Sequence, residues 1–223
     1  MGNKFKVGLI RVLTSEDQAF VNLHGEVIMK HFPGIEVESK CIPNQWEGIH
    51  SHELAEEAIP KIIKVAHTFK DIDMLIVSCA DDPGVAELRL EFPDLAVAGG
   101  GEATVALAQR YGDRIGVLGI VDYAPRAYRE KIPDKICGVV RPKGVNSAVD
   151  LLTEAGRESC FEAAQTLKSS GAEVIALACT GLTTIGIAPE IERRVGIPVI
   201  DPVLAEGTIA CFEKAKRSRV SIG

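Results

Sequence analysis

The chain has 223 residues, of which 46% are hydrophobic and 25% are charged, and its formal net charge is -6. This length suits one large domain or two small ones, and the composition is typical of a soluble globular protein. The acidic balance argues against nucleic acid as a partner, because phosphate binding needs a concentrated basic face. No apolar segment has the length of a membrane span or of a secretion signal, so we expect a cytoplasmic protein.

The first half of the chain predicts strands that alternate with helices. An apolar run at residues 6–14 predicts a strand, and the segment 52–69 predicts an amphipathic helix. The stretch "DMLIVSCADDPG", residues 73–84, is an apolar run that ends on Cys79 and continues into a turn. A further strand is predicted from Leu95. Short apolar runs between helices are typical of parallel sheets that are covered on both faces.

The second half repeats this order. The stretch "RIGVLGIVD" begins 108 residues after "KVGLIRVLT", and Cys179 lies 100 residues after Cys79. A helix is predicted over 158–173, and a strand from Ile197 matches the one from Leu95. We therefore expect an α/β fold of two pseudo-twofold-related domains, each a mainly parallel sheet flanked by helices, with the active site in the cleft between them. The competing interpretation of the repeat is that any two α/β units look alike in sequence, because small residues suit every turn between a strand and a helix.

Cys79 and Cys179 each stand at the carboxyl end of a predicted strand, where open α/β sheets bind ligands. The residues after each cysteine fit helix starts, so we expect the helix dipole and free N–H groups to lower both thiol pKa values. Two facing thiols suit racemisation, because one thiolate removes a proton from carbon and the opposite thiol returns one. The enolate oxygen would be stabilised by backbone N–H groups of the two turns, at Ala80, Asp81, Asp82, Thr180 and Gly181.

This scheme requires no cofactor, and the chain contains no P-loop. The stretch "GGGEAT" from Gly99 lacks the third glycine of a dinucleotide-binding fingerprint, so we expect Gly100 and Gly101 to let the backbone approach a small ligand. Glu102 is either a substrate contact or an acidic residue at a helix start, and we favour the second. Asp201, at the equivalent strand end of the second half, caps a helix or orients the substrate.

Other conspicuous residues are assigned structural roles. The six cysteines form no C-x-x-C pair, and no Cys/His set has zinc-finger spacing. His50 and His52 have no clear third ligand, so we expect a loop before a helix there rather than a metal site. Trp46 is expected to be a packing residue rather than a wall of the cleft. The basic cluster from Lys214 to Arg219 is expected to end a terminal helix.

At these positions the chain resembles the aspartate/glutamate/hydantoin racemase superfamily and, within it, the hydantoin racemase branch. The matching pieces are "SCADDPG", "VAGGGEATVALA" with "GDRIGVLG", "ALACTGLTTIG" and "GIPVIDPVLAEG", in order across nearly the whole chain. The resemblance implies a two-domain α/β fold, a cofactor-independent mechanism and a homo-oligomer, with Cys79 and Cys179 at the catalytic positions. It also implies an exchange of terminal elements, so we expect one domain at 1–99 plus 203–223 and the other at 100–202.

The chain departs from this branch after its first strand. Members often carry an Asn-Pro-Asn-Thr-like loop there that contacts the substrate, and here the region is "IRVLTSED". The candidate substrate contacts in this region are therefore Arg11, Thr14 and Ser15.

These features predict a cofactor-independent racemase or epimerase that acts at a carbon next to a carbonyl. The expected substrate is a small 5-substituted hydantoin or an amino-acid-like molecule, and we expect neither nucleic acid nor a membrane as a partner. Three alternatives stay open. They are an arylmalonate-type decarboxylase on the same scaffold, which needs only one cysteine, a non-catalytic small-molecule-binding protein, and a thiol redox switch that links Cys79 to Cys179.

Overall fold

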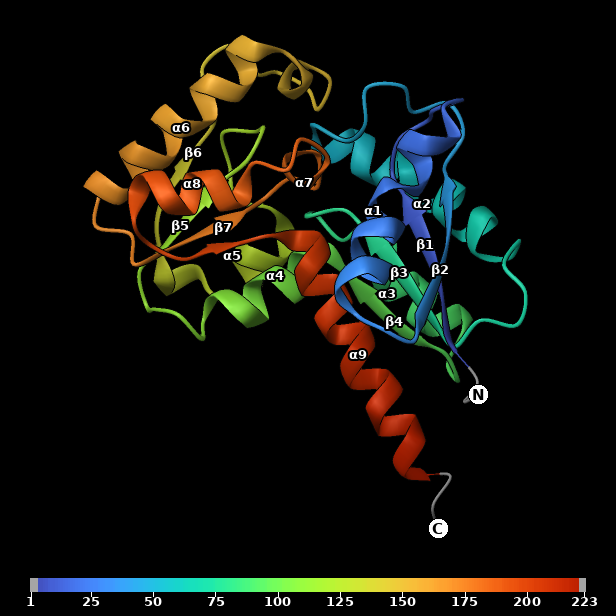
Figure 1. Ribbon diagram of the computed structural model, residues 1–223. Coiled ribbons are helices and arrows are strands. Elements are labelled where there is room, and N and C mark those ends of the chain that lie inside the picture. Colours follow the sequence, from blue (N-terminus) through green and yellow to red (C-terminus); the bar gives the residue numbers. More distant parts are fainter. Residues whose placement is uncertain (1–3, 221–223) are drawn as a thin grey trace.

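The computed structural model describes residues 4–220, which form two lobes of alternating strands and helices (Figure 1). The elements in the first half of the chain are β1 (Phe5–Arg11), α1 (Gln18–His31), β2 (Ile35–Cys41), α2 (His52–Ala66), β3 (Met74–Ser78), α3 (Val85–Glu91), β4 (Ala96–Gly99) and α4 (Gly100–Ala108). Those that follow are β5 (Ile115–Leu118), α5 (Arg126–Lys131), β6 (Ile136–Val140), α6 (Glu154–Ser169), β7 (Val174–Leu177), α7 (Gly181–Thr184), α8 (Ala188–Val195), β8 (Val199–Ile200) and α9 (Pro202–Val220). Two short 3-10 turns, Pro133–Lys135 and Asp150–Leu152, flank β6.

The strands form two four-stranded sheets with the same topology. Their orders are β2-β1-β3-β4 and β6-β5-β7-β8, and every neighbouring pair is parallel. The strands that precede the two cysteines, β3 and β7, therefore occupy equivalent places. This confirms the predicted fold class, a repeated α/β unit with mainly parallel sheets.

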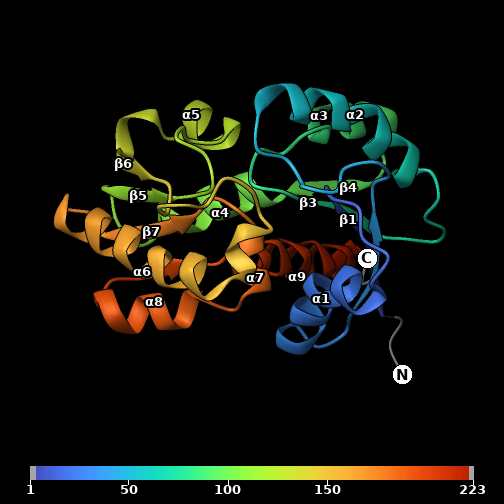
Figure 2. The ribbon, with the colours of Figure 1, turned by 90° about the horizontal axis from the view of Figure 1, so that it is seen from above.

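Helices cover both faces of each sheet, as Figure 2 shows from above. In β3, Leu75 and Val77 pack against the α2 and α3 face, whereas Met74 and Ile76 pack against the α1 and α9 face. Successive side chains of a strand point to opposite faces, so both sets must be apolar. This is why the strands appear in the sequence as continuous apolar runs rather than alternating ones.

The last helix of each half crosses to the other sheet. Ala103 and Ala108 of α4 pack with Val117 and Ala176 of the second sheet. Val203 and Ala210 of α9 pack instead with the first sheet, and Figure 1 shows α9 in red running across to that lobe. The domain assignment, 1–99 plus 203–223 and 100–202, stays a prediction, and its residues 1–3 and 221–223 lie outside the described ones.

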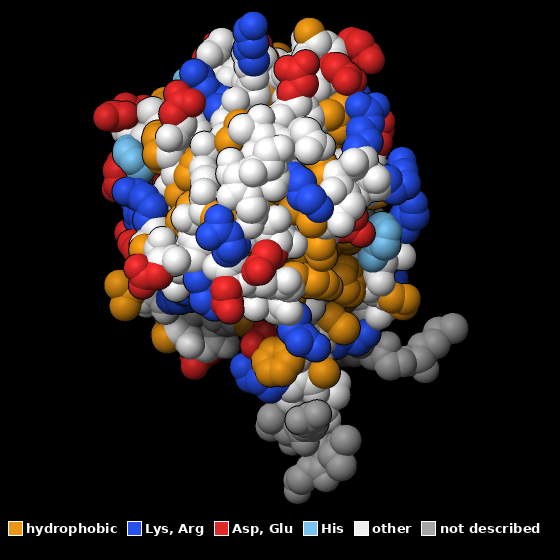
Figure 3. Space-filling model, turned by 90° about the vertical axis from the view of Figure 1, so that its left-hand side faces the viewer, with side chains coloured by type: hydrophobic (Ala, Val, Ile, Leu, Met, Phe, Trp, Pro, Cys, Tyr) orange, Lys and Arg blue, Asp and Glu red, His pale blue; other side chains and the backbone are white. Residues whose placement is uncertain are grey.

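The face of the molecule drawn in Figure 3 carries charges of both signs. On the face drawn in Figure 3, lysine and arginine side chains are interspersed with aspartate and glutamate. Among residues 4–220, no helix is both long and apolar enough to span a membrane. The basic cluster near the C-terminus does lie in the final turns of α9.

Candidate active site

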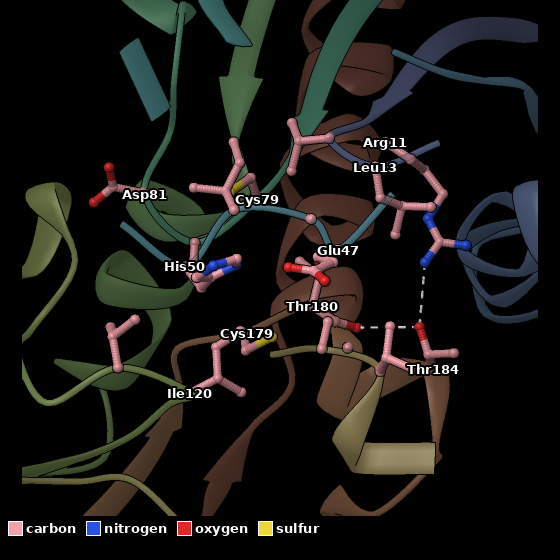
Figure 4. Close-up of a pocket in the computed structure, with 18 of the residues that line it drawn as sticks. Arg11, Leu13, Glu47, His50, Cys79, Asp81, Ile120, Cys179, Thr180 and Thr184 are labelled. Carbon is pink, nitrogen blue, oxygen red and sulfur yellow. Dashed lines mark hydrogen bonds between the residues drawn. The ribbon is translucent and has the colours of Figure 1, made fainter. Parts of the chain in front are cut away.

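A cavity of about 330 Å³ opens between the two lobes, at the carboxyl ends of four central strands. The segments that follow β1, β3, β5 and β7 supply most of its wall, and loops before α2 and near residue 149 complete it. Carboxyl ends of parallel strands present free backbone groups and loop side chains, which makes them the usual ligand site of such sheets. Figure 4 shows Cys79 and Cys179 on opposite sides of this pocket.

Cys79 directly follows β3 and is only 8% exposed. Burial raises its pKa well above the usual value for a thiol, although the backbone N–H of Asp81 acts in the opposite direction. The next helix, α3, begins only at Val85, after a turn. The expected lowering of this pKa by a helix dipole is therefore wrong, because the helix does not start at the thiol and burial dominates.

Cys179 is partly exposed and stands just before the short helix α7. Burial raises its pKa to about 11, against the effect of the N–H groups of Gly181 and Leu182. The expected lowering is wrong here as well, because a single turn of helix provides only a weak dipole against the cost of burying a thiolate. Residues 4–220 contain all six cysteines, and all six are free thiols.

Several predicted residues lie on the pocket wall, although some have structural duties as well. The Thr14 hydroxyl donates to the Ile42 carbonyl at 2.7 Å and accepts from the Gln45 N–H at 2.8 Å. Asp81 accepts from the backbone N–H of Arg126 at 2.8 Å. The sequence-predicted residues on the wall, besides the two cysteines, are Arg11, Thr14, Ser15, Ala80, Asp81, Thr180 and Gly181.

Asp82, Gly100 and Gly101 lie outside the residues that line the pocket. Both carboxylate oxygens of Asp82 accept backbone N–H groups, from Gly101 and Glu102, at 2.7 Å each. A β-carbon at Gly101 would clash with the carbonyl oxygen of Ala80. The glycines therefore let the start of α4 approach the Cys79 turn, which corrects the expectation that they approach a ligand.

Glu102 and Asp201 also lie outside the pocket wall. Glu102 forms ion pairs with Arg89 and, at 3.6 Å, with Lys131. Asp201 accepts from the Thr183 hydroxyl and from the Val203 N–H, at 2.9 Å each. Both carboxylates serve helix starts, the role favoured for Glu102 and one of the two left open for Asp201.

A buried polar network behind the pocket was not predicted. His24 Nδ1 lies 2.9 Å from Ser78 Oγ, and His24 Nε2 lies 3.0 Å from Thr184 Oγ1. Ser78 in turn donates to Glu206 Oε2 at 3.1 Å, and Arg11 donates to Thr184 Oγ1 at 3.3 Å. The network joins β1, α1, β3, α7 and α9, so side chains far apart in sequence support the two cysteine turns.

One signal in the sequence could have pointed to this network. His24 lies on the buried stripe of α1 with Val21, Gly25 and Ile28, at the spacing of one helix face. A polar residue on an apolar stripe needs buried partners. The partners themselves could not be deduced, because Ser78, Thr184 and Glu206 come from three other elements.

The loop before α2 also lines the pocket. Trp46 is 60% exposed and belongs to the wall, so the expectation of an ordinary packing residue is wrong. His50 lies in the loop before α2, as expected, and also faces the pocket (Figure 4). Within the described residues, no group of three His, Cys, Asp or Glu side chains is placed to hold a metal ion.

Comparisons with known families, proteins and structures all find racemases. A family model described as Asp/Glu/Hydantoin racemase matches residues 18–206. A hydantoin racemase from Paenarthrobacter aurescens is 25% identical over 181 residues, which cover 75% of this chain and 72% of that protein. Allantoin racemase from Pseudomonas fluorescens has a TM-score of 0.80 at 20% identity, covering 92% of this chain and 89% of that one.

The same architecture also occurs with another reaction. A double mutant of arylmalonate decarboxylase has a TM-score of 0.62 at 15% identity, covering 94% of this chain and 92% of that one. At such identities the likeness to solved structures shows the fold alone. The choice of reaction must come from the family match and from the side chains in the pocket.

Proposed function

The chain belongs to the Asp/Glu/Hydantoin racemase family, and from this premise we propose a cytoplasmic, cofactor-independent racemase or epimerase whose acid and base are Cys79 and Cys179. The observation that carries the proposal is the place of the two thiols. They follow equivalent strands of two equivalent sheets and lie on opposite sides of one pocket. The proposed substrate is a 5-substituted hydantoin or an amino-acid-like molecule, and the proposed assembly is a homo-oligomer.

The reaction begins with one cysteine as thiolate. It takes the proton from the carbon next to the substrate carbonyl, which leaves an enolate and a neutral thiol. The opposite thiol then gives its proton to the other face of that carbon and becomes the thiolate. Net charge is conserved, and the two cysteines exchange protonation states with each inversion.

The raised thiol pKa values fit this chemistry. A proton on carbon is weakly acidic, so a more basic thiolate is a better acceptor for it. The enolate oxygen is proposed to accept from backbone N–H groups in the turns at Ala80 and Thr180, both on the pocket wall. Preformed N–H groups need little reorganisation when the charge develops.

An arylmalonate-type decarboxylase would need only one thiol, to protonate the carbanion. The presence of a thiol on each side of the pocket favours the two-base reaction. An arylmalonate in the substrate panel separates the two reactions, because a decarboxylase would release carbon dioxide from it.

The test is incubation in D2O with 5-substituted hydantoins, aspartate, glutamate and an arylmalonate, followed by NMR and chiral analysis. We expect exchange of the α-proton and racemisation of at least one panel member. In Cys79→Ser and in Cys179→Ser, racemisation should fall by about 10²- to 10⁴-fold, the usual contribution of a positioned acid or base. Cys211→Ser, which removes an exposed thiol outside the pocket wall, is the matched control. Racemisation that survives both pocket substitutions would mean that other groups move the proton.

A further inference from the structure

Arg11 is a buried cation on the wall of the pocket. It ends the central strand β1, paired in register with Cys41 on one side and Ser78 on the other. Its side chain is 2% exposed, which places it among the largest fully buried side chains of the described chain. It is also the one lysine or arginine among the described residues that line the pocket. A charge in such a place needs a partner, because removing an ion from water is costly.

The protein partners of Arg11 are neutral. One guanidinium nitrogen donates to the carbonyl of Phe20 and the other to the hydroxyl of Thr184 at 3.3 Å. The guanidinium carbon lies 4.5 Å from the centre of the Phe20 ring, a cation–π contact. Within residues 4–220, Arg11 forms no ion pair with a carboxylate. A guanidinium has five N–H donors, so these two bonds leave it able to bind a further acceptor.

Burial disfavours the charged forms of the titratable groups around Arg11. Burial raises the pKa of Cys41, of Glu206 and, to about 11, of Cys179, which favours the uncharged form of each group. Burial lowers the pKa of His24 well below its usual value, which leaves that ring neutral too. Arg11 itself remains protonated, since burial lowers its pKa only to about 10. Arg11 is therefore a buried cation of the pocket wall whose hydrogen-bond partners among the described residues, Phe20 and Thr184, are neutral.

The acidic residues on the pocket wall form no ion pair with Arg11 in the described part of the chain. In Figure 4, Asp81 lies on the far side of the pocket from the guanidinium of Arg11. Glu47 is exposed to solvent in the loop before α2, and Asp17 caps α1 by accepting from Ala19 at 2.9 Å. An anion at the Arg11 end is thus drawn to the cation and kept away from Asp81, in a low-dielectric setting where such differences are large.

We propose that Arg11 binds an anionic group of the substrate, so that the substrate class is carbon acids that carry a carboxylate. This inference rests on the proposed function for the reaction, and it narrows the substrate of the same site. Hydantoins with a neutral alkyl or aryl substituent are then poor substrates. Molecules with a carboxylate a short distance from the acidic carbon are good ones, because the carboxylate and guanidinium form charge-assisted hydrogen bonds.

The test compares two ligands of nearly the same shape, 5-(carboxymethyl)hydantoin and 5-(carbamoylmethyl)hydantoin, which differ in one negative charge. Binding is followed by fluorescence of Trp46, the only tryptophan of the chain, which lies on the pocket wall. At neutral pH and constant ionic strength, the intact protein should bind the carboxylate about tenfold or more tightly than the amide. Equal affinity, tighter binding of the amide, or no binding of either at millimolar ligand would overturn the proposal.

Variants locate the preference. Arg11→Met should reduce the ratio of the two affinities to about one, and Arg11→Lys should retain part of it, because a lysine keeps the charge but not the fork of donors. Arg110→Met removes an exposed cation outside the pocket wall and should leave the ratio unchanged. A preference that persists in folded Arg11→Met contradicts the proposal. If Arg11→Met does not fold, the ratio in the wild-type protein and in Arg11→Lys still decides.

The same two ligands in D2O keep this inference separate from the proposed function. Exchange of the α-proton without any preference for the carboxylate overturns the role of Arg11 and leaves the racemase proposal standing. If the protein shows an Arg11-dependent preference for the carboxylate but no exchange of the α-proton, the role of Arg11 is supported and the racemase proposal is overturned.

Discussion

The two thiols differ from free cysteine in the direction that burial dictates. A thiolate in an apolar pocket loses its hydration, and the few backbone N–H groups near Cys79 and Cys179 do not replace it. The position of each cysteine at a strand end could be predicted from the sequence. The sign of its pKa shift could not, because burial depends on residues from both halves of the chain.

We predict that kcat/KM rises with pH. Both thiols are protonated at neutral pH, with the pKa of Cys179 at about 11, so the thiolate that starts the reaction is scarce. While the pH is below that pKa, the thiolate population grows tenfold for each unit of pH increase. The rate should therefore rise without a plateau between about pH 7 and 9. A pH–rate profile on any substrate of the panel measures this. A plateau reached below neutral pH would show that a thiol with a lowered pKa is at work.

The same shift has a consequence for stability. In the unfolded chain Cys179 loses its proton near an ordinary thiol pKa of about 8.5, whereas the folded chain retains it to about pH 11. The folded state then binds more protons, so the contribution of this group to stability is lost as the pH rises through that window. Rate measurements at the alkaline end therefore need a parallel check that the protein is folded.

At the scale of elements, α4 and the Cys79 turn hold each other in place. Asp82 has a φ of 53°, in the left-handed region that aspartate and asparagine tolerate better than most residues. From that position its carboxylate reaches two N–H groups at the start of α4. The turn that presents Cys79 is thus fixed by α4, the helix that packs against the other sheet.

Asp82→Ala should lower the free energy of unfolding by about 2 kcal/mol, because it leaves two N–H groups without their cap and a strained backbone. Asp82→Asn should cost about half as much, since the amide oxygen still accepts one bond and asparagine tolerates this φ. Urea unfolding followed by circular dichroism measures both values. Equal costs for the two variants would mean that the hydrogen bonds of Asp82 do not hold α4.

The glycines of "GGGEAT" show how much a sequence pattern can predict about a contact. Three glycines in a row indicate that the backbone approaches another group closely, and we expected that group to be a ligand. The pattern does not say what is approached, and here it is the Ala80 carbonyl rather than a ligand. His24 and Glu206 were missed for a related reason: a network assembled from five elements has no spacing of its own in the chain.

At the scale of the whole molecule, the repeat in the sequence was sufficient to predict the architecture. Equivalent apolar runs gave equivalent strands, and both sheets have the same order and direction. The way the lobes meet was not contained in that pattern. Arg11 and His24 of the first lobe both bond to the Thr184 hydroxyl of the second, so residues of both lobes hold the pocket together.

The proposed mechanism uses one base from each half of the molecule, one on each side of the substrate. The most direct measurement is the distribution of deuterium early in the reaction. Racemisation is started from a single enantiomer in D2O and stopped at low conversion. The two enantiomers are then separated, and the deuterium content of each is measured by mass spectrometry. We predict deuterium on the α-carbon of the product and protium in the recovered substrate, because the cysteine that removes the proton is not the one that delivers its replacement. Deuterium in both enantiomers at similar rates from the start would contradict the two-base mechanism, since it would require one base to serve both faces.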